Sequence, residues 1–376
     1  VFSSSAPLTI ACMFVIAAAL SEAGIIAALG SEMKKISKDY GFIGVFGLLS
    51  MVFIMSAFLN NTPTVIILAP VLMQIAKSME LAPSRYLIPL SYVAVMGGSL
   101  TLIGTSTNIL VDSIAQDHGL EKFHIFEMTG PALCMAAAGM VFLTLAAPFF
   151  LPHKKTGLTA KRFANLFNFT RPPVKELNIK KAVISTATLM TVVILAAFQV
   201  MPIAGLSFIG AVFVILTRCI SLQQAYHSMD WSILLLIFGM LGIGQAMQQT
   251  GAAHLLVNLT VDLIKPYGPV IILAGLYLLT SVLTETLTNN AVAVILTPLV
   301  IAMCESLGLN VRPYLIALML ASSASFATPI GYQTNTYVYM KGNFRFTDFL
   351  KIGLPLNLIM WAVAVFVIPM FWSLKA

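Results

Sequence analysis

The stretch TETLTNNAVAVILTPLV, from Thr284 to Val300, places a glutamate and two adjacent amides inside an otherwise apolar part of the sequence. The stretch MSAFLNNTPTVIILAPV, from Met55 to Val71, repeats this pattern, with a second amide pair followed by an apolar run and a proline. Amides and carboxylates are costly to bury among apolar side chains unless other groups bond to them. These two stretches therefore mark places where the chain departs from ordinary apolar helix.

The composition is that of an integral membrane protein. Of the 376 residues, 59% are hydrophobic and 9% are charged, whereas soluble domains carry about 25% charged residues. Alternation of the kind that a transmembrane barrel needs is absent, so we expect an all-α polytopic fold in the lipid bilayer. The net charge of +7 comes from loop Lys and Arg residues, which orient membrane proteins, and it indicates no nucleic-acid partner.

Eight apolar segments are long enough to cross a membrane as helices, namely 6–24, 88–115, 130–151, 181–201, 203–220, 231–250, 313–340 and 350–373. Two further stretches, 41–77 and 268–305, are each broken by an amide motif and are expected to form helical hairpins. Residues 153–180 form a basic loop, which we place on the cytoplasmic side of the cell (inner) membrane. We also expect at least two helices upstream of Val1, because repeat one lacks counterparts of two helices of repeat two.

The two halves of the chain are related by an internal duplication. Several pairs of residues align at offsets of 227 or 228 positions: Gly24 with Gly251, Tyr40 with Tyr267, Gly41 with Gly268, Asn61 with Asn289, Pro70 with Pro298, Gly104 with Gly331 and Asn108 with Asn335. One register held over more than 80 residues indicates a duplicated unit. Repeat one covers 1–152 and repeat two covers 181–376.

The repeats are expected to have opposite orientations in the membrane. Between the span at 6–24 and its counterpart at 231–250 the chain crosses the bilayer five times, and an odd number of crossings inverts the second copy. Hairpin 41–77 would then enter from the cytoplasm and hairpin 268–305 from outside. Their tips would meet near the middle of the membrane.

Four polar patches interrupt the apolar segments: Asn60-Asn61-Thr62, Gly104-Thr105-Ser106-Thr107-Asn108, Thr288-Asn289-Asn290 and Gly331-Tyr332-Gln333-Thr334-Asn335. A broken helix frees carbonyl groups that suit small cations and N–H groups that suit anions. Asn, Ser and Thr oxygens are also hard neutral ligands for a cation such as Na⁺. Such residues can instead join helices through hydrogen bonds, but four matched clusters in two inverted copies favour a binding site.

These motifs resemble those of the divalent anion/sodium symporter family, which contains sodium–dicarboxylate and sodium–sulfate cotransporters. NNTPTVIILAP and TNNAVAVILTP look like that family's paired Ser-Asn-Thr hairpin motifs, and IGTSTN and IGYQTN look like its unwound Gly/Ala-Thr-Pro-Pro-Asn segments. The resemblance implies inverted repeats with two re-entrant hairpins and two unwound transmembrane helices, divided into a scaffold and a transport domain. It also implies sodium-coupled transport by an elevator mechanism in a homodimer, with no organic cofactor.

The resemblance also assigns residues to sites. The implied substrate-binding residues are Asn60, Asn61, Thr62, Thr105, Ser106, Thr288, Asn289, Asn290, Tyr332 and Gln333. The first sodium site comprises Ser56, Asn60, Asn61, Gly104 and Asn108, and the second comprises Thr284, Leu287, Asn289, Gly331 and Asn335. The Pro-Pro pairs are replaced by Ser106-Thr107 and Gln333-Thr334, which favours a small oxyanion such as sulfate over a dicarboxylate.

Several alternatives stay open at this point. Glu285, whose counterpart in repeat one is Ala57, is either a functional carboxylate, such as a proton-coupling group, or a cap for the broken helix. A proton-coupled or sodium-independent anion exchanger, or an anion channel, would be an alternative to sodium symport. An intramembrane enzyme is not expected, because the His-Glu-x-x-His motif and paired intramembrane aspartates are absent from the sequence.

Overall fold

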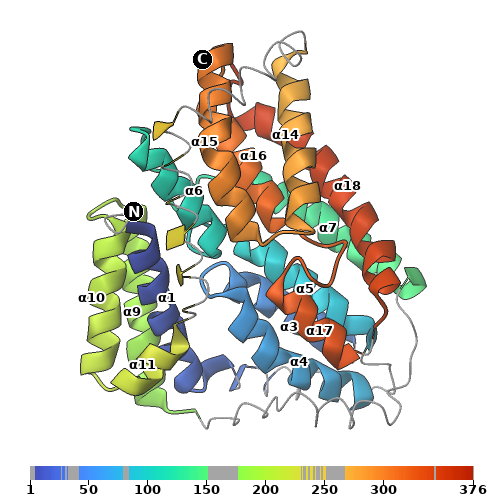
Figure 1. The fold of residues 1–376 in the computed structure, drawn as a ribbon. Coiled ribbons are helices and arrows are strands. Elements are labelled where there is room, and N and C mark those ends of the chain that lie inside the picture. Colours follow the sequence, from blue (N-terminus) through green and yellow to red (C-terminus); the bar gives the residue numbers. More distant parts are fainter. Residues whose placement is uncertain are drawn as a thin grey trace.

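A computed structural model shows that the protein is nearly all helical (Figure 1). The structure describes residues 5–26, 28, 29, 32, 42–78, 84–150, 177–229, 231, 234, 235, 238, 239, 242, 246, 249, 250, 267–342 and 344–375. Over these ranges it contains no β-sheet, and Leu309 and Lys375 form an isolated β-bridge. The predicted all-α class is therefore confirmed.

Helices occupy the segments predicted for repeat one. They are α1 (Ser5–Glu22), α3 (Phe42–Ser56), α4 (Asn61–Ser78), α5 (Ser84–Gly98), α6 (Ser106–Asp117) and α7 (Thr129–Phe150). The pair α3 and α4 forms the predicted hairpin, and α5 and α6 form the predicted broken helix. The part of the chain with the most Lys and Arg residues, 153–176, lies outside the described residues.

Helices also occupy those segments predicted for repeat two that the structure describes. They are α9 (Ile179–Ala197), α10 (Ile203–Leu216), α11 (Leu222–Ser228), α14 (Pro269–Thr284), α15 (Asn289–Leu307), α16 (Val311–Ser323), α17 (Gln333–Gly342) and α18 (Phe346–Phe371). The short helix α11 is not among the predicted spans, and it begins at a capping box formed by Ser221 and Gln224. The predicted span at 231–250 lies largely outside the described residues.

Each broken segment is interrupted at its polar motif. The interruptions are residues 57–60, 99–105, 285–288 and 324–332. In the two hairpins, motif side chains start the second half-helix by accepting hydrogen bonds from free backbone N–H groups. Thr288 Oγ1 accepts from the N–H of Ala291 at 3.3 Å, and Asn60 Oδ1 accepts from the N–H of Thr62 at 3.2 Å. The breaks are thus built by local sequence.

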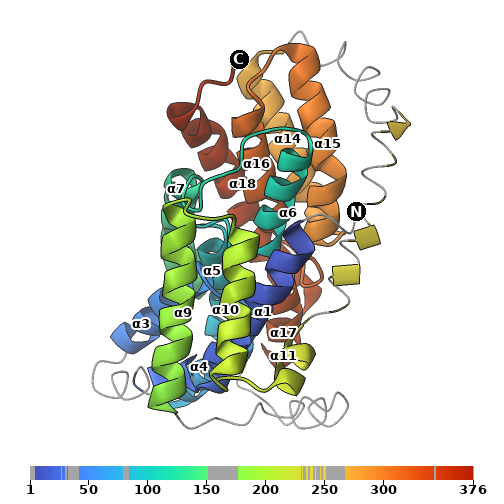
Figure 2. The ribbon, with the colours of Figure 1, turned by 90° about the vertical axis from the view of Figure 1, so that its left-hand side faces the viewer.

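The helices form two groups. Helices α1, α9 and α10 pack together into a three-helix layer, which faces the viewer in Figure 2. The other long helices, α3–α7 and α14–α18, pack into a second group that we call the core bundle, and α1 packs against α6 of this bundle. Figure 1 shows the hairpin α14–α15 in the upper half of the molecule and the hairpin α3–α4 in the lower half.

The surface of the described helices is apolar. Three of them are long and apolar enough by length and composition to cross a membrane: Ile179–Ala197, Asn289–Leu307 and Phe346–Phe371. Large apolar side chains are exposed along α9, α10 and α18, among them Val183, Ile194, Phe208, Phe213, Leu358 and Phe366. Such surface is stable in contact with lipid tails, and the protein is a multi-pass membrane protein.

Candidate functional site

Four half-helices begin near one another at the centre of the core bundle. They are α4, α6, α15 and α17, which start at Asn61, Ser106, Asn289 and Gln333. Helix α15 packs against α6, and α17 packs against α4, so each contact joins one repeat to the other. The N-terminus of a helix carries a partial positive charge of about +0.5. Their convergence creates a region that favours negative charge without any Lys or Arg in the motifs.

Hydrogen bonds between side chains hold these N-termini together. Thr62 Oγ1 donates to Gln333 Oε1 at 3.0 Å. Ser106 Oγ and Thr107 Oγ1 each donate to Asn290 Oδ1 at 3.1 Å. The offsets of the duplication pair Thr62 with Asn290 and Ser106 with Gln333. The two cross-repeat contacts are therefore equivalent, with repeat one supplying hydroxyl donors and repeat two supplying amide acceptors.

Two threonines support the unwound segments by matching hydrogen bonds. Thr101 Oγ1 donates to the carbonyl of Ala57 and accepts from the N–H of Gly104 at 3.1 Å. Thr328 Oγ1 donates to the carbonyl of Glu285 at 2.9 Å and accepts from the N–H of Gly331 at 3.1 Å. Thr101 and Thr328 were missed by the sequence analysis, although they are related by the same offset of 227 positions.

Two asparagines of the unwound segments are also held in matching ways. Asn108 Nδ2 donates to the carbonyl of Thr101 at 3.0 Å, and Asn335 Nδ2 donates to the carbonyl of Thr328 at 3.1 Å. Asn335 Oδ1 additionally accepts from Ser91 Oγ at 2.7 Å. These bonds hold each unwound segment in a defined shape, which a binding site on irregular backbone requires.

Repeat one contains a cluster of buried oxygen atoms, which we call the first cation cluster and define as Ser56, Asn61 and Asn108 with nearby carbonyl groups. The three side chains are 0%, 1% and 0% exposed. Ser56 Oγ, Asn61 Oδ1 and Asn108 Oδ1 have no hydrogen-bond partner among the described residues. Buried polar atoms are rarely left unpaired. Hydroxyl and amide oxygens left without a partner suit a small cation.

Carbonyl groups complete the first cation cluster around Gly104. A Cβ atom at this position would clash with the carbonyl oxygen of Gly98, and it would lie 2.9 Å from the carbonyl oxygen of Ala57 and 3.0 Å from that of Ser56. Only glycine allows three carbonyl oxygens to approach the backbone so closely. The residue type at 104 is therefore set by this crowding.

The equivalent position of repeat two, which we call the second cation cluster, comprises Thr284, Asn289 and Ser325 beside Gly331. Thr284 Oγ1 lies 2.7 Å from both Asn289 Oδ1 and the carbonyl oxygen of Ser322. Ser325 Oγ lies where a Cβ atom of Gly331 would be, and it donates to the carbonyl of Thr284 at 3.3 Å. Asn289 Nδ2, a donor, lacks a partner within the described ranges.

Tyr332 links the two repeats at the centre. Asn61 Nδ2 donates to the Tyr332 hydroxyl at 2.8 Å. This bond fixes the direction of the Asn61 amide, so that Oδ1 is the end left inside the first cation cluster. The offset of 227 pairs Tyr332 with Thr105, a much smaller side chain, whose hydroxyl lies 3.5 Å from that of Thr107.

Glu285 caps the unwound segment after α16. Its Oε1 accepts from the N–H groups of Phe326 at 2.9 Å and Ala327 at 2.7 Å, and its Oε2 accepts from the N–H of Thr328 at 2.8 Å. Asn357 Nδ2 also donates to Oε1 at 2.7 Å. Of the two interpretations of this carboxylate, the structure shows the capping one, with backbone donors that have no helical acceptor.

A small, partly open pocket lies beside the motifs of repeat one. Its polar lining comes from Asn60, Gly104 and Ser106, and its apolar lining comes mainly from α1, including Met13 and Phe14. The pocket therefore lies between the three-helix layer and the core bundle.

Two other predicted site residues lie at the tip of the second hairpin. Thr288 caps α15, and the side chain of Leu287 is exposed.

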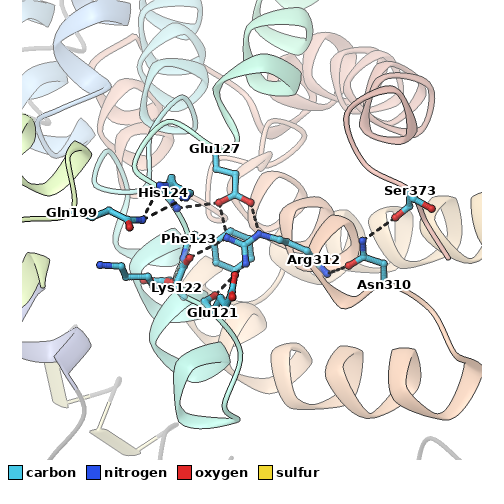
Figure 3. Close-up of polar contacts among 10 residues, drawn as sticks. Glu121, Lys122, Phe123, His124, Glu127, Gln199, Asn310, Arg312 and Ser373 are labelled. Atoms are coloured by element: carbon cyan, nitrogen blue, oxygen red, sulfur yellow. Dashed lines mark hydrogen bonds and ion pairs between the residues drawn. The ribbon is translucent and has the colours of Figure 1, made fainter. Parts of the chain in front are cut away.

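A second polar cluster lies away from the motifs, around Arg312 at the start of α16 (Figure 3). Its guanidinium forms an ion pair with Glu127 and donates to the carbonyls of Glu121 at 3.2 Å and Lys122 at 3.0 Å. It also stacks over the ring of Phe123 at 4.4 Å. The cluster fastens the connection between α6 and α7 to repeat two.

A family model described as citrate transporter (CitMHS) matches residues 1–297 and 286–376. An uncharacterized transporter of Synechocystis is 24% identical over 538 positions, covering 96% of this chain and 87% of the relative. An uncharacterized transporter of Escherichia coli, YfbS, is 37% identical over 155 residues, covering 41% of this chain and 25% of the relative. Sodium/sulfate cotransporter 1 of Chlamydomonas reinhardtii is 28% identical over 200 residues, covering 52% of this chain and 23% of the relative.

Two solved structures share the fold. The YdaH transporter of Alcanivorax borkumensis matches with a TM-score of 0.67 at 14% identity, covering 100% of this chain and 88% of that one. MtrF of Neisseria gonorrhoeae matches with a TM-score of 0.66 at 14% identity, covering 98% of this chain and 81% of that one. These two structures show the shared fold. The family model and the relatives named sodium/sulfate cotransporters confirm the resemblance seen in the motifs.

Proposed function

The chain belongs to the citrate transporter family, and from this premise we propose that it couples the uptake of a small divalent anion to sodium. Sulfate or a similar inorganic oxyanion is the favoured substrate. The relatives named sodium/sulfate cotransporters support this choice. The proposal rests on one observation above all. Four half-helix N-termini converge beside buried oxygen atoms that have no hydrogen-bond partner in the part of the chain that the structure describes.

The anion would bind where the four N-termini meet. Thr62, Ser106 and Thr107 are hydroxyl donors that bond to amide oxygens of Asn290 and Gln333. A bound oxyanion would replace these amide oxygens as the acceptor for the three hydroxyl groups. Its oxygen atoms carry more negative charge, and hydrogen bonds to charged acceptors are stronger. The amides could then turn their own N–H groups toward the anion. Short hydroxyl and amide side chains favour a compact anion over a dicarboxylate.

The cation would bind at the first cation cluster, where its charge lies close to the anion. Ser56, Asn61 and Asn108 contribute oxygen atoms, and the carbonyls around Gly104 add neutral ligands. Attraction between a bound cation and a nearby anion strengthens the binding of both, and this coupling is reciprocal. This mutual strengthening of cation binding and anion binding is the physical basis of symport.

Alternating access would come from movement of the core bundle against the three-helix layer, in an elevator-type motion within a homodimer. The pocket between α1 and the motifs of repeat one supports this division, because it lies at the boundary between the two groups. We place the protein in the cell (inner) membrane with residues 153–180 in the cytoplasm, in agreement with the excess of Lys and Arg in that loop.

Uptake into liposomes tests the proposed function. Purified protein is reconstituted, and accumulation of labelled sulfate, thiosulfate, succinate and citrate is measured with an inward Na⁺ gradient and with choline in place of Na⁺. We expect sulfate and thiosulfate to accumulate only with the Na⁺ gradient. Equal uptake in choline would support a sodium-independent exchanger, and a single-channel conductance would support a channel.

Asn61→Ala provides a direct test of the first cation cluster. Loss of an oxygen ligand to a charged partner costs about 1.5–3 kcal/mol, so the sodium concentration for half-maximal sulfate uptake should rise by roughly tenfold or more. Asn178→Ala is the matched control, since Asn178 is an exposed cap of α9. Unchanged sodium dependence in Asn61→Ala would contradict the assignment.

A further inference from the structure

The two cation clusters differ at one position that faces the glycine of each unwound segment. In repeat one this position is Gly98, and in repeat two it is Ser325, at an offset of 227. Resting on the proposed function, we propose that the coupling cation binds in repeat one only, and that the Ser325 hydroxyl closes the equivalent position in repeat two. The protein would then use one cation position of a duplicated pair.

In repeat one the space beside Gly104 is surrounded by acceptors. The carbonyl oxygens of Ser56 and Gly98 lie beside the place where a Cβ atom of Gly104 would be. The carbonyl oxygen of Ala57 lies there too and accepts from Thr101 Oγ1. Ser56 Oγ and Asn61 Oδ1 are buried and have no hydrogen-bond partner among the residues described. Acceptors that face each other repel and gain nothing from burial unless a positive charge or a donor lies between them. A small cation supplies that charge.

In repeat two the equivalent space is filled by the protein itself. Ser325 Oγ occupies the position beside Gly331 and donates to the carbonyl of Thr284. That carbonyl is the counterpart of the Ser56 carbonyl in repeat one. Asn289 Oδ1 is also engaged, because Thr284 Oγ1 lies 2.7 Å from it. Asn289 Nδ2 has no partner within the described ranges, and this donor would repel a cation.

The carboxylate of Glu285 holds this closed arrangement in place. Glu285 Oε2 lies 3.4 Å from Ser325 Oγ and 2.8 Å from the N–H of Thr328. Its counterpart in repeat one is Ala57, which has no side-chain acceptor. The segment that carries Ser325 is thereby fixed by three backbone donors on one carboxylate, so Ser325 is held beside Gly331.

Tyr332 is a second difference between the repeats that favours cation binding in repeat one. Its hydroxyl accepts from Asn61 Nδ2 at 2.8 Å, which leaves Asn61 Oδ1 facing the first cation cluster. The group that orients the cation ligand of repeat one therefore comes from the substrate-facing segment of repeat two. The anion chamber and the single cation position are joined through this one hydroxyl.

Exchanging the two residues tests the proposal. Ser325→Gly removes the hydroxyl and makes repeat two like repeat one. Gly98→Ser introduces a side chain whose Cβ atom would lie 2.6 Å from the Asn61 amide, so it closes the first cation cluster. Ser323→Gly is the control for Ser325→Gly, because Ser323 is also buried at the end of α16. Sodium-dependent sulfate uptake and the sodium-dependent rise in melting temperature are measured for each variant.

The wild type should show a Hill coefficient for sodium of about 1, since this coefficient cannot exceed the number of coupled sites. Ser325→Gly should raise it toward about 2, while Ser323→Gly leaves it unchanged. Gly98→Ser should lose both the sodium dependence of uptake and the sodium-dependent rise in melting temperature, because ligand binding to the folded state raises that temperature. A wild-type coefficient of about 2 would overturn the proposal.

A further pair of variants keeps the test decisive if Ser325→Gly or Gly98→Ser fails to fold. Asn61→Ala should shift the sodium-dependent rise in melting temperature to sodium concentrations roughly tenfold higher or more, and Asn289→Ala should leave that sodium dependence unchanged. If the two variants weaken the sodium dependence of the melting temperature equally, the single-site proposal is overturned, while sodium symport itself is not. If sodium changes neither uptake nor melting temperature of the wild type, the proposed function itself fails.

Discussion

At the residue scale, the carboxylate of Glu285 takes the place of a missing helical turn. Three consecutive backbone N–H groups, from Phe326 to Thr328, and the Asn357 amide all donate to it. Water is scarce inside the membrane, so these donors would otherwise be left unpaired at several kcal/mol each. A single side chain that accepts these bonds therefore makes an unwound segment possible in an apolar environment.

Glu285→Gln should destabilise the protein. Glutamine keeps one acceptor oxygen but turns an NH₂ group toward at least one of the backbone donors, and leaving such donors unpaired costs about 1–3 kcal/mol each. We expect a lower melting temperature in detergent. Glu305→Gln, which changes an exposed carboxylate on α15, is the matched control. An unchanged melting temperature together with lost pH dependence of uptake would indicate proton coupling instead of capping.

Tyr332→Phe should weaken sodium binding without closing the site. The change leaves Asn61 Nδ2 without its acceptor, and loss of one hydrogen bond of about 0.5–1.5 kcal/mol corresponds to a twofold to tenfold higher half-maximal sodium concentration. Tyr332→Thr should additionally enlarge the anion chamber, so that succinate competes with sulfate. Tyr339→Phe, on helix α17 that follows Tyr332, is the control. Identical sodium titrations of Tyr332→Phe and wild type would contradict this role.

At the element scale, the broken helices are arranged so that each half-helix has a task. The C-terminal ends of α3 and α5 bring carbonyl groups together around Gly104. The N-terminal ends of α4, α6, α15 and α17 bring N–H groups and hydroxyl donors together at the centre. The same break thus supplies ligands for opposite charges on its two sides. In the proposed function, this separation would place a cation and an anion close together.

Arg312→Ala should loosen the connection between α6 and α7. Arg312 bonds to Glu127 and to two carbonyls of this connection (Figure 3), and hydrogen bonds to a charged group contribute about 1.5–3 kcal/mol. We expect a lower melting temperature and faster proteolysis near residues 118–128. Glu121→Ala is the control, because Glu121 contributes its carbonyl. Wild-type proteolysis in Arg312→Ala would show that the clamp is dispensable.

At the scale of the whole molecule, the three-helix layer and the core bundle meet along α1 and at the end of α9. Gln199 Nε2 lies 2.8 Å from His124 Nδ1, so the turn after α9 contacts the connection between α6 and α7. The proposed elevator movement requires this contact to separate, because the two residues belong to different helix groups. The contact is therefore a marker of the state seen in the structure.

A cross-link between the two groups should stop transport. Cysteines at positions 199 and 124, in a background with Cys134→Ser to remove the exposed native thiol, would be bridged by mercury. We expect sulfate uptake to fall when the bridge forms and to recover when a thiol reductant removes it. Each single-cysteine variant serves as a control. Full uptake by the bridged protein would contradict movement between these groups.

Much of the architecture could be predicted from the sequence. The apolar runs predicted the helices, and the interruptions at 57–60 and 285–288 fall on the amide motifs. The duplication predicted equivalent positions, such as Asn108 and Asn335, which do make matching bonds. The roles assigned to these residues in binding stay predictions. Thr101 and Thr328 were missed, because threonine in an apolar helix end carries no signal unless both copies are compared.

The sequence by itself determined the membrane class, the helix positions and the internal repeat, because apolar runs, helix-breaking motifs and a constant offset are all local or linear features. Only the tertiary structure decided which side chains meet. Thr62 and Gln333 are 271 positions apart, as are Asn61 and Tyr332, and the offset relates equivalent residues, not bonded ones. Whether Ser325 fills a space or Glu285 caps a segment depends on the direction of a side chain in three dimensions, which packing between distant segments determines.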